Sequence, residues 1–257
     1  MPLAGRQVSG GIRLVRPVGS GSHSVAYLAV TPLGQPCTVK VFRPHMLEHA
    51  QRELRVGRQF RHPRLSQVGA LTQLDDAPAL IMSWVPGETL FTRYKKRPAL
   101  RCEAGAYLTS LCDVLEALDY IHGIGVLHRD IKPDNILVQD SGHATLVDYD
   151  LSGPVDEPLG GQIGTPAFQS PEARAGRDLG TASDLYGIGL LLHWGLWGEL
   201  PEPEIPPQVR SEAPPPPFQA EALELVRHLL DPDIADRPTS AAEVRSELLR
   251  WRAELPH

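Results

Sequence analysis

Residues 126–138 read Val-Leu-His-Arg-Asp-Ile-Lys-Pro-Asp-Asn-Ile-Leu-Val (VLHRDIKPDNILV), a polar cluster between two apolar runs. Its polar centre holds a carboxylate, Asp130, followed by an ammonium at Lys132 and an amide at Asn135. Pro133 stiffens the turn, and apolar residues flank both ends. A purely structural turn does not need all three polar groups. We therefore predict that they face one cavity and take part in chemistry.

A second carboxylate follows in Ala-Thr-Leu-Val-Asp, residues 144–148, which reads as a short strand ending in Asp148. Carboxylate and amide oxygens are the ligands that hard divalent cations prefer. Asn135 and Asp148 are thus the predicted metal ligands, and this assignment leaves Asp130 to act on a substrate hydroxyl.

Lysine is rare in this chain, which has 25 basic residues but lysine only at positions 40, 95, 96 and 132. A compact ammonium suits a site that binds phosphate where a planar guanidinium does not fit. Lys40 lies on a predicted strand that follows the glycine-rich sequence Gly19-Ser-Gly21-Ser-His-Ser. Two glycines there would let the backbone close over phosphates, with the Lys40 ammonium beneath them. Glu53, thirteen residues after Lys40, is the predicted counter-charge.

The order of the predicted elements indicates a small β-rich region followed by a larger helical one. We expect an α+β fold with two lobes: an N-lobe at 1–82, a hinge at 83–88 and a C-lobe at 89–257, within one domain at 1–257. The predicted strands are 12–18, 25–30, 37–42, 71–74 and 79–84, and the predicted helices are 44–60, 107–122, 184–197, 220–230 and 241–251.

Composition narrows the function classes. The formal net charge of −6 argues against a general nucleic-acid-binding protein. No apolar run approaches the roughly 20 residues of a membrane span. Cys37, Cys102 and Cys112 have neither metal-ligand spacing nor an even number for disulfides, so reduced thiols are expected. These features, with an N-terminus that lacks an apolar signal core, predict a cytoplasmic protein.

Taken together, the motifs resemble those of the eukaryotic-type (Hanks-type) serine/threonine protein kinases, from about Ile12 to Leu249. Arginine-rich, lysine-poor usage suggests a bacterial member. The elements occur in the order of that family: the glycine-rich loop, CTVK ending at Lys40, Glu53, HRDIKPDN at 128–135, DYD at 148–150, GTPAFQSPE at 164–172, Asp184 and Arg237.

The resemblance implies a bilobal kinase that uses ATP and Mg²⁺, with Mn²⁺ as an alternative ion, to phosphorylate Ser or Thr hydroxyls of protein substrates. Asp130 would be the catalytic base and Lys132 the serine/threonine-type lysine beside Thr165. Lys40, paired with Glu53, would bind the α and β phosphates. The nucleotide-binding set that it implies is Val18, Gly19, Gly21, Ala26, Thr38, Lys40, Met82 as gatekeeper, Ser83 and Val85 in the hinge, and Leu137.

Two departures from the family pattern stand out. Asp150 replaces the final glycine of D-F-G, which would restrict flipping of Asp148 or recruit a cation. Gly57 lies four residues after Glu53, where the family usually has an apolar side chain. Glycine there costs a helix about 1 kcal/mol. Activity could therefore depend on a partner or on ligand that closes the lobes.

The activation segment has no hydroxyl-bearing residue between Gly153 and Gly164. Family members with arginine before the catalytic aspartate usually neutralise it with a phosphorylated residue in this segment. Here Asp156 and Glu157 could pair with Arg129 instead. We expect a kinase that needs no phosphorylation of its activation segment.

Two other functions stay open at this point. Asp150 and Gly57 would also suit a pseudokinase that binds nucleotide as a scaffold. So would the glycine-rich loop, where Ser24 replaces the third glycine of the family and Ala26 the usual valine. A small-molecule kinase of the aminoglycoside or choline type shares the Asp130, Asn135 and Asp148 core, but that family lacks Lys132, the segment at 164–172 and Arg237. Arginines 52, 55, 58 and 61 on the helix that bears Glu53 could bind an acidic regulatory partner, although a solvated face explains them as well.

Overall fold

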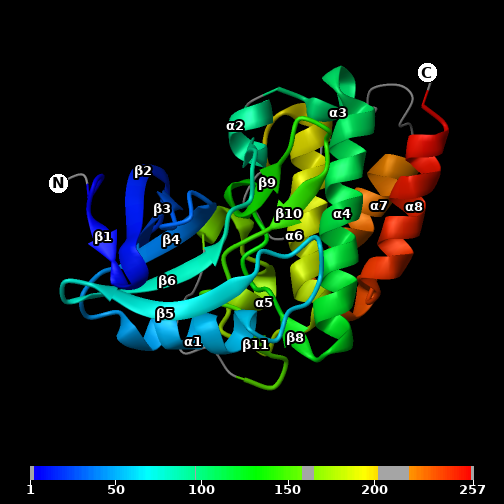
Figure 1. Cartoon of the computed structure of the whole chain (residues 1–257). Coiled ribbons are helices and arrows are strands. Elements are labelled where there is room, and N and C mark those ends of the chain that lie inside the picture. The colour runs from blue at the N-terminus through cyan, green and yellow to red at the C-terminus, as the bar shows by residue number, and fades with distance from the viewer. Residues whose placement is uncertain (1–2, 96, 158–164, 202–219, 256–257) are drawn as a thin grey trace. The chain divides into compact units, whose positions relative to one another are not determined.

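The computed structural model describes residues 3–95, 97–157, 165–201 and 220–255 (Figure 1). By its internal contacts the chain divides into two compact units. The first comprises Met1–Pro86 and Asp148–Asp150, and the second comprises Gly87–Val147 and Leu151–His257. Three residues that follow a strand of the second unit thus pack with the first. The predicted bounds of lobes and hinge stay a prediction.

An antiparallel sheet of six strands, in the order β1-β2-β3-β4-β6-β5, forms the first unit. One helix, α1, packs against β5 and β6 (Figure 1). The elements are β1 (Gln7–Val8), a 3-10 turn η1 (Ser9–Gly11), β2 (Ile12–Ser20), β3 (Ser24–Val30), β4 (Pro36–Phe42), α1 (Leu47–Gly57), β5 (Val68–Leu74) and β6 (Ala77–Ser83).

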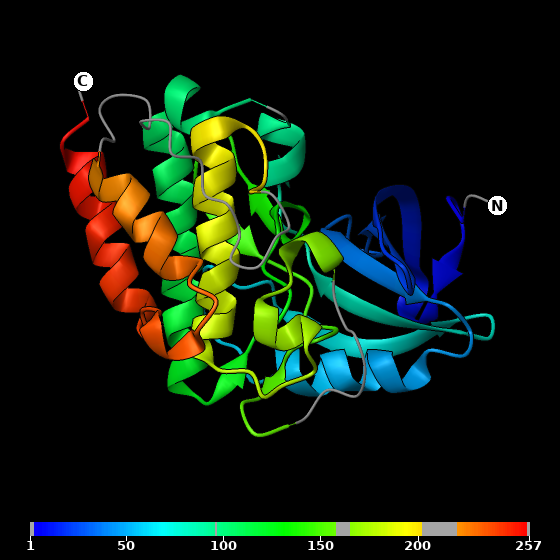
Figure 2. The same cartoon turned by 180° about the vertical axis from the view of Figure 1, so that it is seen from behind.

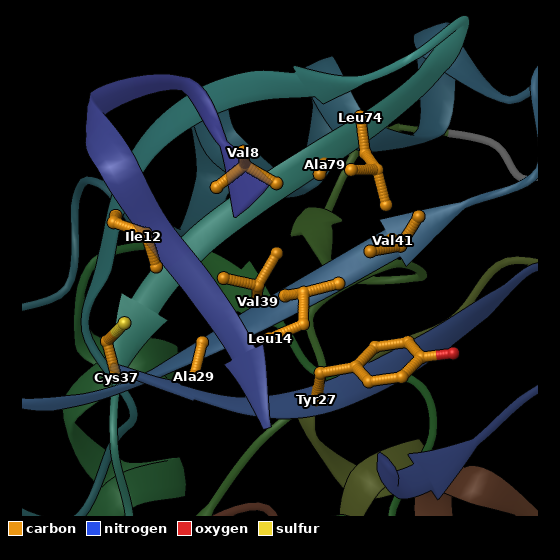
Figure 3. Close-up of a cluster of buried hydrophobic side chains, with 10 residues drawn as sticks. All are labelled: Val8, Ile12, Leu14, Tyr27, Ala29, Cys37, Val39, Val41, Leu74 and Ala79. Atoms are coloured by element: carbon orange, nitrogen blue, oxygen red, sulfur yellow. The ribbon is translucent and has the colours of Figure 1, made fainter. Parts of the chain in front are cut away.

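A cluster of buried apolar side chains in the first unit lies on one face of this sheet (Figure 3). Side chains alternate between the two faces of a strand, and antiparallel partners share a face. In β4, Cys37 and Val39 therefore point into the apolar cluster, whereas Thr38 and Lys40 point to the other face. The cluster comprises Val8, Ile12, Leu14, Tyr27, Ala29, Cys37, Val39, Val41, Leu74 and Ala79.

Helices dominate the second unit. Helix α4 packs against α8, and α6 packs against α7, as both views show (Figures 1 and 2). The helices are α2 (Leu90–Tyr94), α3 (Ala99–Cys102), α4 (Ala104–Gly123), α5 (Pro171–Arg174), α6 (Thr181–Trp197), α7 (Ala220–Leu229) and α8 (Ala241–Ala253), with 3-10 turns η2 (Pro133–Asn135), η3 (Pro166–Phe168) and η4 (Ile234–Asp236).

Two short antiparallel sheets complete the second unit, in the orders β10-β9-β7 and β11-β8. Their strands are β7 (Glu88–Thr89), β8 (Val126–Leu127), β9 (Ile136–Val138), β10 (Ala144–Leu146) and β11 (Gly153–Pro154). The hairpin β9–β10 carries Asn135 at its start and Asp148 just beyond its end. Within the described part of the chain, none of the helices has the length and hydropathy needed to cross a membrane.

The predicted α+β class is confirmed, with strands concentrated in the first unit and helices in the second. The predicted helix at 44–60 is shorter in the structure, where α1 covers Leu47–Gly57. No side chain caps its start at Met46, and the chain leaves the helix just after Gly57, a poor helix former. The strand predicted to end at Asp148 stops at Leu146, because Val147 already hydrogen bonds to Asn135.

Candidate active site

Lys40 is the centre of the polar group in the first unit. Its ammonium lies 2.6 Å from Glu53 Oε2 and 2.7 Å from Asp148 Oδ1. Glu53 is completely buried in α1, and Lys40 is almost as buried on β4. Burial by itself would lower the pKa of Lys40, but the two carboxylates more than offset it and raise that pKa. Lys40 therefore carries a fixed positive charge.

Four of the residues predicted to bind nucleotide share one face of the first sheet. Ala26 is the cross-strand partner of Lys40, and Thr38 is the partner of Met82. Thr38 and Lys40 lie two residues apart on β4, so all four side chains point away from the apolar cluster. Val18, on β2 beside this face, is 37% exposed. The register thus assembles an apolar surface next to a single ammonium.

The glycine-rich loop turns between β2 and β3, where Gly21 N–H donates to the Ser24 carbonyl at 2.9 Å. Neither Gly19 nor Gly21 has a positive φ, and a Cβ atom on either would meet nothing closer than 3.9 Å. The fold itself therefore does not require glycine at these positions. Close approach of a ligand to the backbone would require it.

The predicted hinge residues differ in what they can offer a ligand. The Ser83 N–H already donates to the Gln67 carbonyl at 2.9 Å, and the Gln67 N–H donates to Ser83 Oγ at 3.0 Å. The carbonyl is thus the backbone group of Ser83 that suits a ligand. Val85 lies just after the end of β6, outside any helix or strand, and is partly exposed.

In the second unit, the loop at 128–135 brings its three predicted groups together. Lys132 Nζ donates to Asp130 Oδ2 at 2.7 Å and to Thr165 Oγ1 at 2.9 Å. Asn135 Nδ2 donates to the Asp130 carbonyl and to Asp130 Oδ2, each at 2.9 Å. Two donors therefore fix the Asp130 carboxylate. A donating amide nitrogen also leaves Asn135 Oδ1 as the atom that can bind a cation.

Asp184, in the first turn of α6, binds the backbone of this loop. Its carboxylate accepts the backbone N–H groups of His128 and Arg129 at 2.9 and 2.7 Å, and His122 Nε2 lies 2.9 Å away. Arg129 has a φ of +69°, which is costly for a residue with a Cβ. Burial would raise the pKa of Asp184, but the His122 contact and these N–H bonds hold it below its ordinary value.

Arg129 is neutralised within the described part of the activation segment. Its guanidinium donates to the carbonyl oxygens of Pro154 and Glu157, the latter at 2.9 Å, and Glu157 Oε2 lies 3.9 Å from Arg129 Nη1. These contacts agree with the predicted role of Glu157. Residues 158–164 of the segment lie outside the described residues.

The structure gives Asp150 two partners that the sequence analysis missed. His49 Nδ1 lies 2.9 Å from Asp150 Oδ1, and His23 Nδ1 lies 3.3 Å from Asp150 Oδ2. One signal was available: His49 precedes Glu53 by one helical turn and therefore shares its face of α1. The position of His23 within the glycine-rich loop carried no such signal.

The predicted basic face of the helix that bears Glu53 is shorter in the structure, because α1 ends at Gly57 and both Arg58 and Arg61 lie beyond it. Arg58 donates to the Gly69 carbonyl at 3.0 and 2.8 Å, and Arg61 donates to the carbonyls of Arg58 and Phe60 at 3.0 and 2.8 Å. These contacts give both side chains a structural role.

The predicted metal ligands belong to different units, Asp148 to the first and Asn135 to the second. Their donor atoms suit Mg²⁺, because a carboxylate oxygen and an amide oxygen are hard ligands. Asp148 has a φ of +69°, and its carboxylate accepts from the Lys40 ammonium. The remaining predicted residue, Leu137, lies half-buried on β9 in the second unit.

Comparisons with known proteins agree with these features. A family model described as protein kinase domain matches residues 12–249. Serine/threonine-protein kinase pkn2 of Myxococcus xanthus is 32% identical, over 94% of this chain and 32% of that protein. Pkn3 of the same organism is 30% identical, over 95% and 50% of the two chains, and the probable serine/threonine-protein kinase PkwA of Thermomonospora curvata is 30% identical, over 90% and 33%.

The chain thus spans between about a third and a half of the length of these relatives. Residues 12–249, which match the family model, contain both polar groups described above, around Lys40 and around Asp130. The chain belongs to the protein kinase family.

Proposed function

We propose that this chain is an active serine/threonine protein kinase that transfers the γ-phosphoryl group of ATP to hydroxyl groups of protein substrates. One observation carries the proposal: Lys132 joins the Asp130 carboxylate to the Thr165 hydroxyl, at 2.7 and 2.9 Å. This arrangement fixes the carboxylate and places a positive charge beside it. An incoming hydroxyl would find a proton acceptor and a stabilising cation at one point.

In the proposed reaction, the oxygen of the substrate hydroxyl bonds to the γ-phosphorus of ATP. The bond between that phosphorus and the β-phosphate oxygen breaks, and ADP leaves. Asp130 accepts the proton of the substrate hydroxyl. Lys132 stabilises the charge that develops on the transferred group. Lys40 binds the α and β phosphates, held in position by Glu53 at 2.6 Å. Gly19 and Gly21 let the loop backbone approach those phosphates.

Asn135 and Asp148 would hold Mg²⁺, with Mn²⁺ as an alternative. Such an ion supplies positive charge to the phosphate oxygens and orients them for transfer. The adenine would lie against the face formed by Ala26, Thr38 and Met82 together with Val18. Leu137, in the second unit, completes the proposed nucleotide-binding set. The Ser83 carbonyl and the Val85 backbone would bind the edge of the base.

The test is a transfer assay with radiolabelled ATP, Mg²⁺ and a general substrate such as myelin basic protein. Asp130→Asn is expected to lower kcat by at least about 100-fold while leaving ATP affinity within about threefold, because general base catalysis contributes roughly 10²–10⁴ in rate. Asp140→Asn is the matched control, since Asp140 is an exposed aspartate in the turn after β9. Full activity of Asp130→Asn would refute the proposal.

The same assay addresses the alternatives. A pseudokinase would bind ATP and label neither itself nor the substrate. A small-molecule kinase would leave proteins unlabelled but would phosphorylate an aminoglycoside or choline. The contact between Lys132 and Thr165 favours the protein kinase, because the resemblance places this pair in serine/threonine kinases.

Protein substrates and ATP are the expected partners, with no nucleic acid. A regulatory partner on the basic positions at 52–61 would compete with the backbone carbonyls to which Arg58 and Arg61 donate. The cytoplasm is the proposed location, and the buried free thiols of Cys37 and Cys112 suit its reducing conditions.

A further inference from the structure

Two histidines and one carboxylate converge in the first unit, next to the contact between Lys40 and Asp148. Asp150 Oδ1 lies 2.9 Å from His49 Nδ1, and Asp150 Oδ2 lies 3.3 Å from His23 Nδ1. The imidazole rings are 4.9 Å apart between centroids and tilted by 40°. One potential ligand atom from each residue lies within 4.8 Å of the other two.

The three side chains come from separate segments. His23 belongs to the glycine-rich loop, His49 to the first turn of α1, and Asp150 to the segment that follows Asp148. The Asp150 side chain is 15% exposed, whereas those of His23 and His49 are 35% and 38% exposed. The group is thus shielded on the carboxylate side and open to solvent on the imidazole side, so an ion could reach it.

The ligand types and spacing suit a transition metal. Two imidazole nitrogens and one carboxylate oxygen form a common set for Zn²⁺, with a water as fourth ligand. Ligand atoms bound to one tetrahedral Zn²⁺ at about 2.0 Å lie roughly 3.3 Å from one another. Both nitrogen–oxygen distances are already near that value, and the two half-exposed imidazoles need only approach each other further.

The charge around Asp150 also favours a cation. Asp150 N–H lies 3.3 Å from Asp148 Oδ1, and Asp148 and Glu53 share the single ammonium of Lys40. The carboxylates of Glu53, Asp148 and Asp150 thus lie in one region of the first unit. A divalent ion bound beside Asp150 would offset part of their negative charge.

We propose that His23, His49 and Asp150 form a binding site for one divalent transition-metal ion of the Zn²⁺ type. This site explains why aspartate stands at position 150. It is distinct from the oxygen ligands of Asn135 and Asp148, because imidazole nitrogen selects Zn²⁺ over Mg²⁺. A bound ion would tie the glycine-rich loop to α1 and to the segment after Asp148.

Metal binding to the full chain tests the proposal. After treatment with a chelator, the protein is titrated with Zn²⁺ by calorimetry in excess Mg²⁺, which occupies oxygen-ligand sites. The wild type is expected to bind one equivalent and to unfold at a higher temperature when loaded, since a ligand that binds only the folded state stabilises it. Co²⁺ replaces Zn²⁺ in a second titration, and the visible spectrum reports tetrahedral coordination.

Asp150→Asn and His49→Gln are expected to weaken Zn²⁺ binding by at least roughly tenfold and to abolish the tetrahedral Co²⁺ spectrum. His45→Gln is the matched control, because His45 is an exposed histidine four residues before His49. Circular dichroism and thermal melting without metal establish that each variant folds. Absence of binding to wild type, or equal affinity in Asp150→Asn, His49→Gln and His45→Gln, would overturn the proposal.

Discussion

Gly57 lies against Tyr149 so closely that a side chain at position 57 would overlap its neighbours. A Cβ atom there would be 3.0 Å from Tyr149 Cδ2 and 2.4 Å from Val68 Cγ2. The Tyr149 ring also packs edge-on against Phe60, with centroids 4.8 Å apart. Packing thus explains the glycine at position 57, because the absence of a side chain makes room for the Tyr149 ring and for Val68.

Gly57→Ala should therefore destabilise the protein although alanine is the better helix former. The gain of about 1 kcal/mol in helix propensity opposes an overpacking cost of about 1–3 kcal/mol. We expect a lower midpoint in urea unfolding. In a double-mutant cycle, Val68→Ala should cost less stability in the Gly57→Ala background than in the wild type. Additive effects would contradict the packing explanation.

Tyr149→Phe tests the hydroxyl group of Tyr149, which is fully buried. The hydroxyl donates to the Ser66 carbonyl at 3.0 Å and accepts from Ser66 Oγ at 3.1 Å, in a buried position. We expect a loss of about 1 kcal/mol in the free energy of unfolding. If Ser66→Ala produces the same loss in the Tyr149→Phe background as in the wild type, the two hydroxyls do not act together.

The buried pair of Glu172 and Arg237 predicts a pH dependence of stability. Arg237 donates to both carboxylate oxygens of Glu172 at 2.8 Å. Burial would raise the pKa of Glu172, but Arg237 and neighbouring hydroxyls lower it to about 2 from its ordinary 4.5. A lowered folded-state pKa stabilises the protein above pH 4.5, and this contribution is lost as the pH falls toward 2.

Thermal unfolding measured across that range checks the prediction. Glu172→Gln/Arg237→Met should lose less stability on acidification than the wild type does, because the titrating group is absent. Arg237→Met alone should cost about 3–5 kcal/mol at neutral pH, since it leaves a buried carboxylate uncompensated. Parallel acid profiles for wild type and the double variant would contradict this role of Glu172.

The contacts of Arg129 with Pro154 and Glu157 predict activity without phosphorylation of the activation segment. The carbonyl oxygens and the Glu157 carboxylate supply negative charge to the guanidinium in the unmodified chain. Phosphatase treatment should leave the specific activity unchanged, and mass mapping should find no phosphate in residues 148–172. Loss of activity together with a phosphate in this segment would refute the idea.

Asp184→Asn should lower kcat more than it raises the KM for ATP. Asp184 holds the backbone of His128 and Arg129, directly before Asp130, whereas Lys40 lies in the other unit. An amide accepts with only one oxygen, so one of these N–H groups loses its partner at a cost of about 1–3 kcal/mol. Kinetics and unfolding of Asp184→Asn, with the exposed Asp178→Asn as control, measure both effects.

Much of the fold was determined by the sequence alone, because its signals are local. Alternation along β4 and helical spacing along α4 depend only on residues a few positions apart, and both elements were predicted. The group at Asp130, Lys132 and Asn135 was predictable for the same reason, since five residues connect its ends. The pairing of Lys40 with Glu53 followed from motif order.

Tertiary structure alone decided the contacts that join distant segments. Asp150 meets His23 and His49 across sequence separations of 127 and 101 residues, and the ring of Tyr149 meets Gly57 in the same way. Residues 148–150 belong to the first unit although the chain around them belongs to the second. Periodicity reports which face a residue occupies on its own element. Only the packed chain determines which side chain, from which other element, fills the space opposite.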